Sequence, residues 1–218
     1  MFSYYGTKKK LAKYYPDPLY DTIIEPFAGA AQYSLFGDNW RKQVILIDSY
    51  DIIVKIWYYL INARPNDILQ LPDMYPGDNV DSHSQLCNEE RWLIGFCING
   101  GSAMPKKTVQ KYNNWNRSKI QIAKNLYKIK HWVIKHGSHL DAPNISATWY
   151  IDPPYQHGGK WYRFNNKTID YYSLAQWCIK RMGQVIVCEN MMADWLPFAP
   201  LAKLHGQLHT TTEAIWTR

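Results

Sequence analysis

Residues 22–31 read T-I-I-E-P-F-A-G-A-A, and residues 43–48 read Q-V-I-L-I-D. Both begin as short apolar runs with β-branched residues, which is typical of buried strands. Residues 49–60 follow with apolar side chains at helical spacing and with Ser49 as the expected N-cap. Strands that alternate with helices predict a parallel α/β sheet, so these stretches decide the fold class.

The same pattern returns toward the end of the chain. Residues 148–152 (T-W-Y-I-D) and 184–190 (Q-V-I-V-C-E-N) are interpreted as strands, and residues 173–182 between them as a helix. Residues 207–218 are rich in Thr, which favours β structure, and they are interpreted as a hairpin.

The middle of the chain is expected to be helical. Residues 88–98 are interpreted as one helix, and residues 117–136 as a longer one with Asn116 as its N-cap and Gly137 at its end. We therefore expect an inserted, mostly helical domain over residues 62–144, and a sheet domain formed by residues 1–61 and 145–218.

The composition is that of a globular chain. Of its 218 residues, 46% are hydrophobic and 20% charged, which excludes a disordered protein. No run approaches the roughly 18 apolar residues that a membrane helix needs, and residues 1–10 do not resemble a signal peptide. The four Cys have neither disulfide nor zinc spacing, so we expect reduced cytoplasmic thiols and no metal.

The charge indicates a polyanionic partner. The net charge is +7, and 10 Trp and 17 Tyr supply surfaces on which bases can stack. Residues 62–90 carry six acidic side chains and one basic side chain, whereas residues 105–136 carry nine Lys or Arg and no acid. This asymmetry predicts a solvated linker followed by a segment that faces nucleic acid.

Two features at the expected strand ends favour a nucleotide-like ligand. The loop of residues 25–31 is built mainly from small residues and is expected to precede a helix, so a ligand can approach its backbone and the free N–H groups. Asp48 ends the next strand, where an acid in an open α/β sheet binds ribose hydroxyls. A helix-capping role is the alternative for Asp48.

The sharpest motif is D-P-P-Y at residues 152–155, directly after an expected strand. Two prolines fix the backbone and remove two N–H donors, so the carbonyl oxygens before and between them are free to accept hydrogen bonds. Together with the Asp152 carboxylate and the Tyr155 ring, they suit a planar base that carries an exocyclic amino group. The alternative is a Pro-Pro turn that only ends the strand.

Four basic side chains follow the expected long helix at spacings of 7, 4 and 7: Arg117, Lys124, Lys128 and Lys135. On a helix they share one face, which predicts phosphate contacts, with a solvated face as the alternative. Tyr112 and Trp115 precede this stretch as candidates to wedge between bases or stack on them, or else to cover the helix.

A fourth motif, Y-Y-G-T-K at residues 4–8, is by itself best explained as a frayed basic tail. In the order Y-Y-G-T-K, E-P-F-A-G, Asp48 and D-P-P-Y, however, the motifs resemble the DNA adenine-N6 methyltransferases of the Dam type. The resemblance covers most of the sheet domain and, loosely, the insertion. It implies a Rossmann-like methyltransferase sheet, a target-recognition insertion, and S-adenosylmethionine as methyl donor without a metal.

The resemblance also implies a role for individual residues. The positions that match cofactor-binding residues are Tyr4, Lys8, Glu25, Phe27, Gly29, Asp48 and Asp152. The positions that match the catalytic tetrad are Asp152, Pro153, Pro154 and Tyr155. In that family scheme the Asp152 carboxylate and the Pro153 carbonyl accept hydrogen bonds from N6, and Tyr155 stacks on a flipped adenine.

The chain departs from the family pattern in three places. Its loop continues G-A-A where the family more often has another glycine, and Thr7 stands where many members have Gly or Asn. The stretch F-C-I-N-G-G at residues 96–101 resembles the family's F-x-x-N-G turn, but the usual hairpin does not follow. These departures leave the recognised DNA sequence open.

The resemblance therefore implies methylation of adenine N6 in double-stranded DNA, by base flipping and direct in-line transfer. By analogy, a small methyltransferase of this kind fits a phage enzyme in the cytoplasm of a bacterial or phage-infected host cell. Two alternatives stay open: an RNA or cytosine-N4 amino-methyltransferase, and a non-catalytic nucleic-acid-binding module on the same scaffold.

Overall fold

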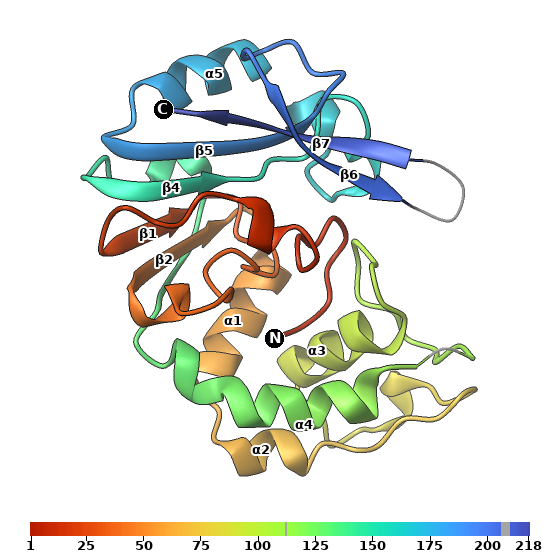
Figure 1. The fold of residues 1–218 in the computed structure, drawn as a ribbon. Coiled ribbons are helices and arrows are strands. Elements are labelled where there is room, and N and C mark those ends of the chain that lie inside the picture. The colour runs from red at the N-terminus through yellow and green to blue at the C-terminus, as the bar shows by residue number, and fades with distance from the viewer. Residues whose placement is uncertain (112, 206–209) are drawn as a thin grey trace.

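The computed structural model describes residues 1–111, 113–205 and 210–218 (Figure 1). Within them, the chain is a mixed α/β protein with a seven-stranded sheet of order β3-β2-β1-β4-β5-β7-β6. The parallel strands are β1 (Thr22–Glu25), β2 (Gln43–Asp48), β3 (Val133–His136), β4 (Ala147–Ile151) and β5 (Gly183–Asn190). The antiparallel strands are β7 (Thr210–Thr217), beside β5, and β6 (Ala199–His205). This architecture is compatible with a Rossmann-like fold.

The strand order reverses between β1 and β4. From β1 the chain adds β2 and β3 on one side, and it then returns to add β4 and β5 on the other side. Loops that leave the carboxyl ends of β1 and β4 therefore run in opposite directions and leave a crevice between them. In open α/β sheets a ligand binds in this crevice, so the topology alone marks a place for a site.

The centre of the sheet is buried on both faces. All five residues of β4 are buried, and their side chains alternate between two hydrophobic cores. Tyr150 belongs to the core that α1 (Asp51–Asn62) covers, whereas Trp149 and Ile151 belong to the core that α5 (Tyr171–Ile179) covers. Parallel strands that are covered on both sides need apolar residues throughout. The continuous apolar runs of the sequence therefore correctly predicted β1, β2, β4 and β5.

The remaining helices lie between β2 and β3 in the sequence and pack together. They are α2 (Pro65–Leu69), α3 (Asn88–Ile98) and α4 (Trp115–Asn125), and with α1 they form the lower lobe in Figure 1. The apolar face expected on α1 is buried, but the N-cap position is held by Tyr50 rather than Ser49. Ser49 instead donates its hydroxyl to the Gly137 carbonyl oxygen at 3.0 Å. No helix among the described residues is long and apolar enough to cross a membrane.

The single helix expected over residues 117–136 is wrong. Helix α4 ends at Asn125, a 3-10 turn covers Leu126–Ile129, and β3 follows and pairs with β2. Trp132 and Ile134 are buried whereas Val133 and Lys135 are exposed, which is the alternation of a strand. The range 62–144 expected as an insertion therefore contains a strand of the sheet, and the helical segment joins β2 to β3.

The helix expected directly after residues 25–31 is also wrong. Residues 28–37 form consecutive turns, in which Gly29 has φ +44°, Ala31 +46° and Gly37 +52°. A right-handed helix cannot accommodate these left-handed conformations, so no helix N-terminus is formed there. At the end of the chain, the expected β structure is present as β7, which pairs with β6 and β5. Residues 207–209 of the expected hairpin lie outside the described residues.

Candidate functional site

A cavity of about 490 Å³ lies at the carboxyl ends of the parallel strands. Its walls come from the residues that follow β1, β2, β3 and β4, and from residues 4–8 and 162–174. This position matches the crevice that the strand order creates, and the volume is in the range of small-molecule sites, roughly 300–1,000 Å³.

The cavity gathers the residues that the resemblance assigned to the cofactor. All seven contribute to its lining: Tyr4, Lys8, Glu25, Phe27, Gly29, Asp48 and Asp152. Of the D-P-P-Y tetrad, Asp152 and Pro154 line the cavity, whereas Pro153 and Tyr155 do not.

Asp48 joins the ends of β1 and β2. Its Oδ2 accepts the Gly29 N–H at 2.9 Å, and its Oδ1 accepts the Tyr50 N–H at 2.8 Å. Burial raises the pKa of Asp48 to about 6, although these two N–H groups act in the opposite direction. Each oxygen keeps a further lone pair for a ligand, so Asp48 holds the loops and can still accept a hydroxyl hydrogen bond.

Glu25 has a structural role in the same wall. It is almost completely buried, and its Oε1 accepts the Ser34 N–H at 2.9 Å. Burial raises the pKa of Glu25 to about 8, so its carboxyl group is mostly protonated at neutral pH. It therefore fixes the turns after β1. Phe27, which lies further out, stacks on His139 with ring centroids 5.4 Å apart and gives the cavity an aromatic wall.

The N-terminal motif is built into the site and is not a frayed tail. Tyr4 and Lys8 are buried, and the Tyr162 hydroxyl donates to the Tyr5 carbonyl oxygen at 3.2 Å. Gly6 has φ +73°, and a Cβ there would lie 2.0 Å from the Tyr162 hydroxyl oxygen. Only glycine fits at this position, so the motif and the loop after D-P-P-Y depend on each other.

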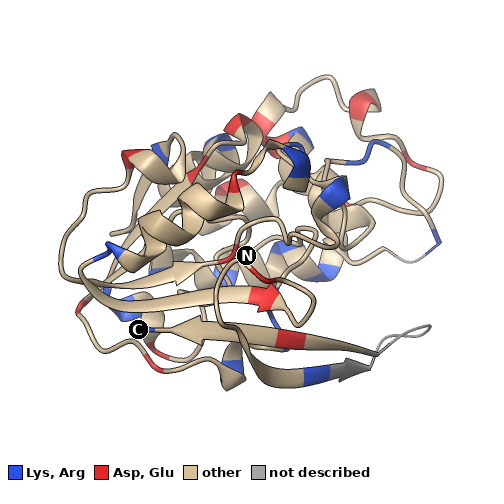
Figure 2. Ribbon diagram, turned by 90° about the horizontal axis from the view of Figure 1, so that it is seen from above, with Lys and Arg blue, Asp and Glu red and all other residues tan. Residues whose placement is uncertain are grey.

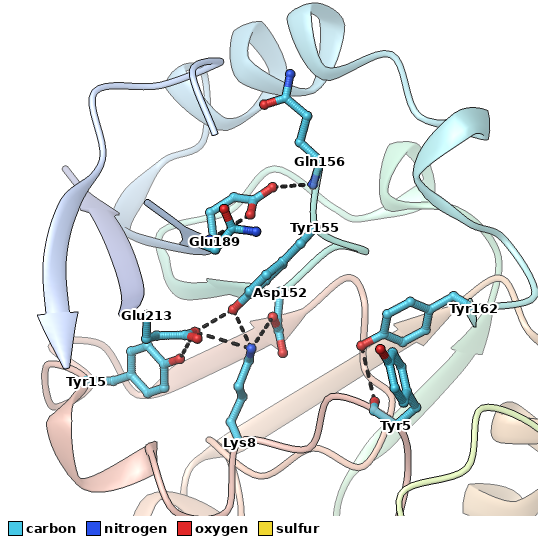
Figure 3. Close-up of polar contacts among 10 residues, drawn as sticks. Tyr5, Lys8, Tyr15, Asp152, Tyr155, Gln156, Tyr162, Glu189 and Glu213 are labelled. Atoms are coloured by element: carbon cyan, nitrogen blue, oxygen red, sulfur yellow. Dashed lines mark hydrogen bonds and ion pairs between the residues drawn. The ribbon is translucent and has the colours of Figure 1, made fainter. Parts of the chain in front are cut away.

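Asp152 faces Lys8 at the edge of the cavity (Figure 3). The Lys8 ammonium lies 3.4 Å from Asp152 Oδ1 and donates a hydrogen bond to the Tyr155 hydroxyl. Burial raises the pKa of Asp152 to about 7, while Lys8 acts against this rise. Burial alone would lower the pKa of Lys8, but Asp152 and Glu213 together raise it. Lys8 therefore stays charged.

The backbone of the D-P-P-Y turn offers acceptors as the sequence predicts. The carbonyl oxygens of Asp152 and Pro153 accept no hydrogen bond from a residue that the structure describes. By contrast, the Pro154 carbonyl oxygen accepts the Tyr171 hydroxyl at 2.7 Å, which ties the turn to α5.

Two buried carboxylates of this region were not predicted. Glu213 on β7 accepts the Tyr15 hydroxyl at 2.6 Å, and Glu189 on β5 accepts the backbone N–H groups of Gln156 and Asn190 (Figure 3). Burial raises the pKa of Glu189. An acid inside a strand is the only local signal for either residue, and no motif includes them.

The expectation that four basic side chains share one helix face is wrong. Arg117 and Lys124 are exposed on α4, but Lys128 lies on the 3-10 turn and Lys135 on β3. The four charges therefore do not share one helix, and none of them lines the cavity. Figure 2 shows Lys and Arg residues spread over several elements and loops.

The aromatic candidates near this helix do not form a wedge. Trp115 is the first residue of α4, is fully buried, and donates its Nε1–H to the Pro72 carbonyl oxygen at 2.8 Å. It therefore covers the helix, the alternative left open above. Tyr112 lies outside the described residues.

Exposed aromatic and basic side chains instead flank the cavity on the loop after D-P-P-Y. Trp161 is 64% exposed and Phe164 48% exposed, and Lys160 and Lys167 are exposed on the same loop. Phe164 and the neighbouring Arg163 line the cavity. No acidic residue lies between Asp152 and Asp170, so this stretch, which the sequence analysis did not single out, presents positive charge beside the site.

Comparisons with known proteins add little to this geometry. No family model matches the chain, and no curated protein matches it. Among solved structures, it is similar to a conserved hypothetical protein of Streptococcus pyogenes, with 9% identity and a TM-score of 0.35. That match covers 89% of this chain and 84% of the other chain. A TM-score this low supports no conclusion about fold or function.

Proposed function

We propose that this chain transfers a methyl group from S-adenosylmethionine to the N6 amino group of adenine in DNA. One observation carries the proposal. Asp152 lines the same cavity that Asp48 borders, and the backbone carbonyl oxygens of Asp152 and Pro153 accept no hydrogen bond from a described residue. A ribose acceptor and a cluster of amino-group acceptors thus meet in one site.

The cavity fits the proposed methyl donor. Asp48 offers acceptors for a ribose hydroxyl pair, and Phe27 and Tyr50 give apolar faces for an adenine ring. Gly29 lines the cavity and lets the Tyr4 ring pack against its backbone, because it has φ +44° and a Cβ at this position would lie 3.1 Å from that ring. S-adenosylmethionine would supply an electrophilic methyl group to this site.

The acceptors around Asp152 address the chemical difficulty of the reaction. The lone pair of an adenine amino group is delocalised into the ring, so the nitrogen is a poor nucleophile. Hydrogen bonds from the amino group to the Asp152 carboxylate and the Pro153 carbonyl oxygen favour a pyramidal nitrogen with a localised lone pair. Catalysis then comes from position and electrostatics and needs no covalent enzyme intermediate.

The loop after D-P-P-Y supports a nucleic-acid substrate. An adenine inside a duplex cannot reach a buried acceptor, so the base has to leave the stack or be single-stranded. Trp161 and Phe164 offer exposed rings beside the cavity, and Lys160 and Lys167 offer charges for phosphates. Tyr155, the residue assigned to base stacking, lies against Lys8, with the ammonium 4.1 Å from the centre of its ring.

The proposal is tested with S-adenosylmethionine that carries a labelled methyl group and with separate DNA, RNA and protein acceptors. We expect label in DNA, recovered as N6-methyladenine after digestion to nucleosides. Label in RNA or in N4-methylcytosine would replace the proposed acceptor, and nucleic-acid binding without transfer to any acceptor would favour a non-catalytic module. Asp152→Ala protein, checked for folding by circular dichroism, is the matched negative control.

A further inference from the structure

Glu213 lies at the centre of a buried polar network behind the site. Its side chain is 4% exposed, and its Oε1 accepts hydrogen bonds from the hydroxyls of Tyr15 and Tyr155 (Figure 3). The Lys8 ammonium lies 3.2 Å from the same oxygen. Glu213 thus contacts both Tyr155 and Lys8, and Lys8 also pairs with Asp152.

Lys8 lies between two carboxylates. Its ammonium has three N–H groups, and its partners are Asp152, Glu213 and the Tyr155 hydroxyl. The Lys8 side chain is only 9% exposed, so water screens these interactions little. If one partner is removed, the ammonium moves toward those that remain.

We propose that Glu213 is a positioning residue of the site. It holds the Lys8 ammonium between two carboxylates, so that Lys8 pairs only with Oδ1 of Asp152 and the other carboxylate oxygen stays free for a substrate amino group. The role assigned to Glu213 rests on the proposed function. The arrangement of charges around Asp152, however, is present in the protein without any ligand, so it can be tested separately.

The effect of Glu213 on Asp152 has a definite sign. The pKa of Asp152 is raised mainly by burial; Lys8 lowers it, and the negative charges of Glu213 and Glu189 raise it. A neutral residue at position 213 removes one raising charge and releases Lys8 toward Asp152. Both changes lower the pKa of Asp152.

Several groups face Asp152 and have to be considered together. They come from the N-terminal segment, from β1, β4, β5 and β7, and from D-P-P-Y and the loop after it: Lys8, Tyr15, Glu25, Tyr150, Cys188, Glu189, Glu213, Tyr155 and Tyr162. Glu189 is the matched control, because it is a buried carboxylate that contacts neither Lys8 nor Tyr155 in the structure.

The test is a carbon-13 NMR titration of the Asp152 carboxyl group in the ligand-free protein, with the signal assigned by its loss in Asp152→Asn. For Glu213→Gln we expect the midpoint to fall by about one pH unit, as for removal of a nearby like charge. Glu189→Gln should move it by less than half as much, and Tyr15→Phe should leave it nearly unchanged. An unchanged midpoint in folded Glu213→Gln protein, or equal shifts for Glu213→Gln and Glu189→Gln, would overturn the proposal.

A second variant covers the case in which Glu213→Gln does not fold. Glu213→Asp keeps the charge but withdraws it from Lys8 and Tyr155 by one methylene group. We expect kcat for methyl transfer to fall at least tenfold, while the cofactor Kd stays within twofold. Wild-type kcat in a folded Glu213→Asp protein would contradict a positioning role. Because the NMR titration needs no turnover, a chain that methylates nothing would defeat the proposed function and leave this result readable.

Discussion

Asp48 uses both carboxylate oxygens to hold the turns that follow β1 and β2. The sequence offered two roles for it, a ribose ligand and a capping residue, and the structure shows that its backbone contacts do not exclude the first. In Asp152, by contrast, only one carboxylate oxygen has a partner among the described residues. Its Oδ1 faces Lys8, and the rest of the carboxylate borders the cavity. The two acids thus differ in how much of their hydrogen-bonding capacity the fold already uses.

A substitution of Asp48 should weaken cofactor binding more than DNA binding. We expect Asp48→Ala to weaken binding of S-adenosylmethionine by at least about tenfold, because a ribose acceptor and the Gly29 contact are lost together. DNA affinity should change far less. Isothermal titration calorimetry measures the first quantity and fluorescence anisotropy the second. A cofactor Kd equal to that of the wild type would reject the assigned role.

Glu25 predicts a pH dependence of stability. The pKa of Glu25 is about 8 in the folded protein, compared with an ordinary value of 4.5. Between pH 4.5 and pH 8 the folded state therefore keeps a proton that the unfolded state has released. Stability should therefore fall as the pH rises from about 4.5 to 8. Glu25→Gln keeps an acceptor for the Ser34 N–H and carries no proton to lose.

Relative to the wild type, Glu25→Gln should gain stability across that range, by at most about 4 kcal/mol at pH 8. Urea unfolding at pH 5 and pH 8 measures the difference. A difference between variant and wild type that is the same at both pH values would show that Glu25 does not titrate in this window.

At the scale of elements, two segments far apart in the sequence close the site. Residues 4–8 pack against the loop after D-P-P-Y, because the rings of Tyr4 and Tyr5 each contact the Tyr162 ring, with centroids 5.9 Å and 5.1 Å apart. Gly6 makes this contact possible, since a side chain at position 6 would collide with the Tyr162 hydroxyl.

Gly6→Ala should therefore weaken cofactor binding by displacing the loop. Adding Tyr162→Phe removes the colliding hydroxyl and should restore part of the affinity, because the next ring atom is 3.3 Å away. Gly77→Ala is the matched control: Gly77 has φ +96°, but nothing lies within 4 Å of the added carbon. Equal cofactor affinities for Gly6→Ala and Gly77→Ala would show that the collision has no consequence for the site.

Because the four basic residues do not share one helix, we expect DNA to follow the loop after D-P-P-Y instead. Lys160→Ala with Lys167→Ala should reduce the salt slope of log K for DNA by about 1.8, at roughly 0.9 for each lost phosphate contact. Arg117→Ala with Lys124→Ala removes two exposed charges from α4 and should leave the slope nearly unchanged. The reverse pattern in salt titrations by anisotropy would place the DNA on α4 instead.

For the whole molecule, the features that could be predicted from the sequence are those that neighbouring residues determine. Strands β1, β2, β4 and β5 and helix α1 were predicted, because continuous or periodic apolar residues specify them. Strand β3 was missed, because its four residues follow a helical pattern and become a strand only by pairing with β2. Glu213 was missed for a similar reason, since its partner Tyr15 lies 198 residues away in the sequence.

The seven residues that the resemblance assigned to the cofactor line one cavity, because the strand order brings separate motifs to one sheet edge. The expected basic face did not form, because it depended on one uninterrupted helix and the chain breaks that helix at Asn125. The strand order therefore determines where the crevice lies. The surface around the crevice depends on contacts between residues far apart in the sequence.

The most direct test of the central claim compares wild-type and Asp152→Asn proteins with DNA and S-adenosylmethionine, with N6-methyladenine quantified by mass spectrometry. Asparagine keeps the shape of the side chain but removes the charged acceptor. We expect the wild type to form N6-methyladenine and Asp152→Asn to form at least about 100-fold less, with cofactor binding retained. Wild-type amounts of N6-methyladenine from folded Asp152→Asn protein, or none from the wild type, would contradict the account.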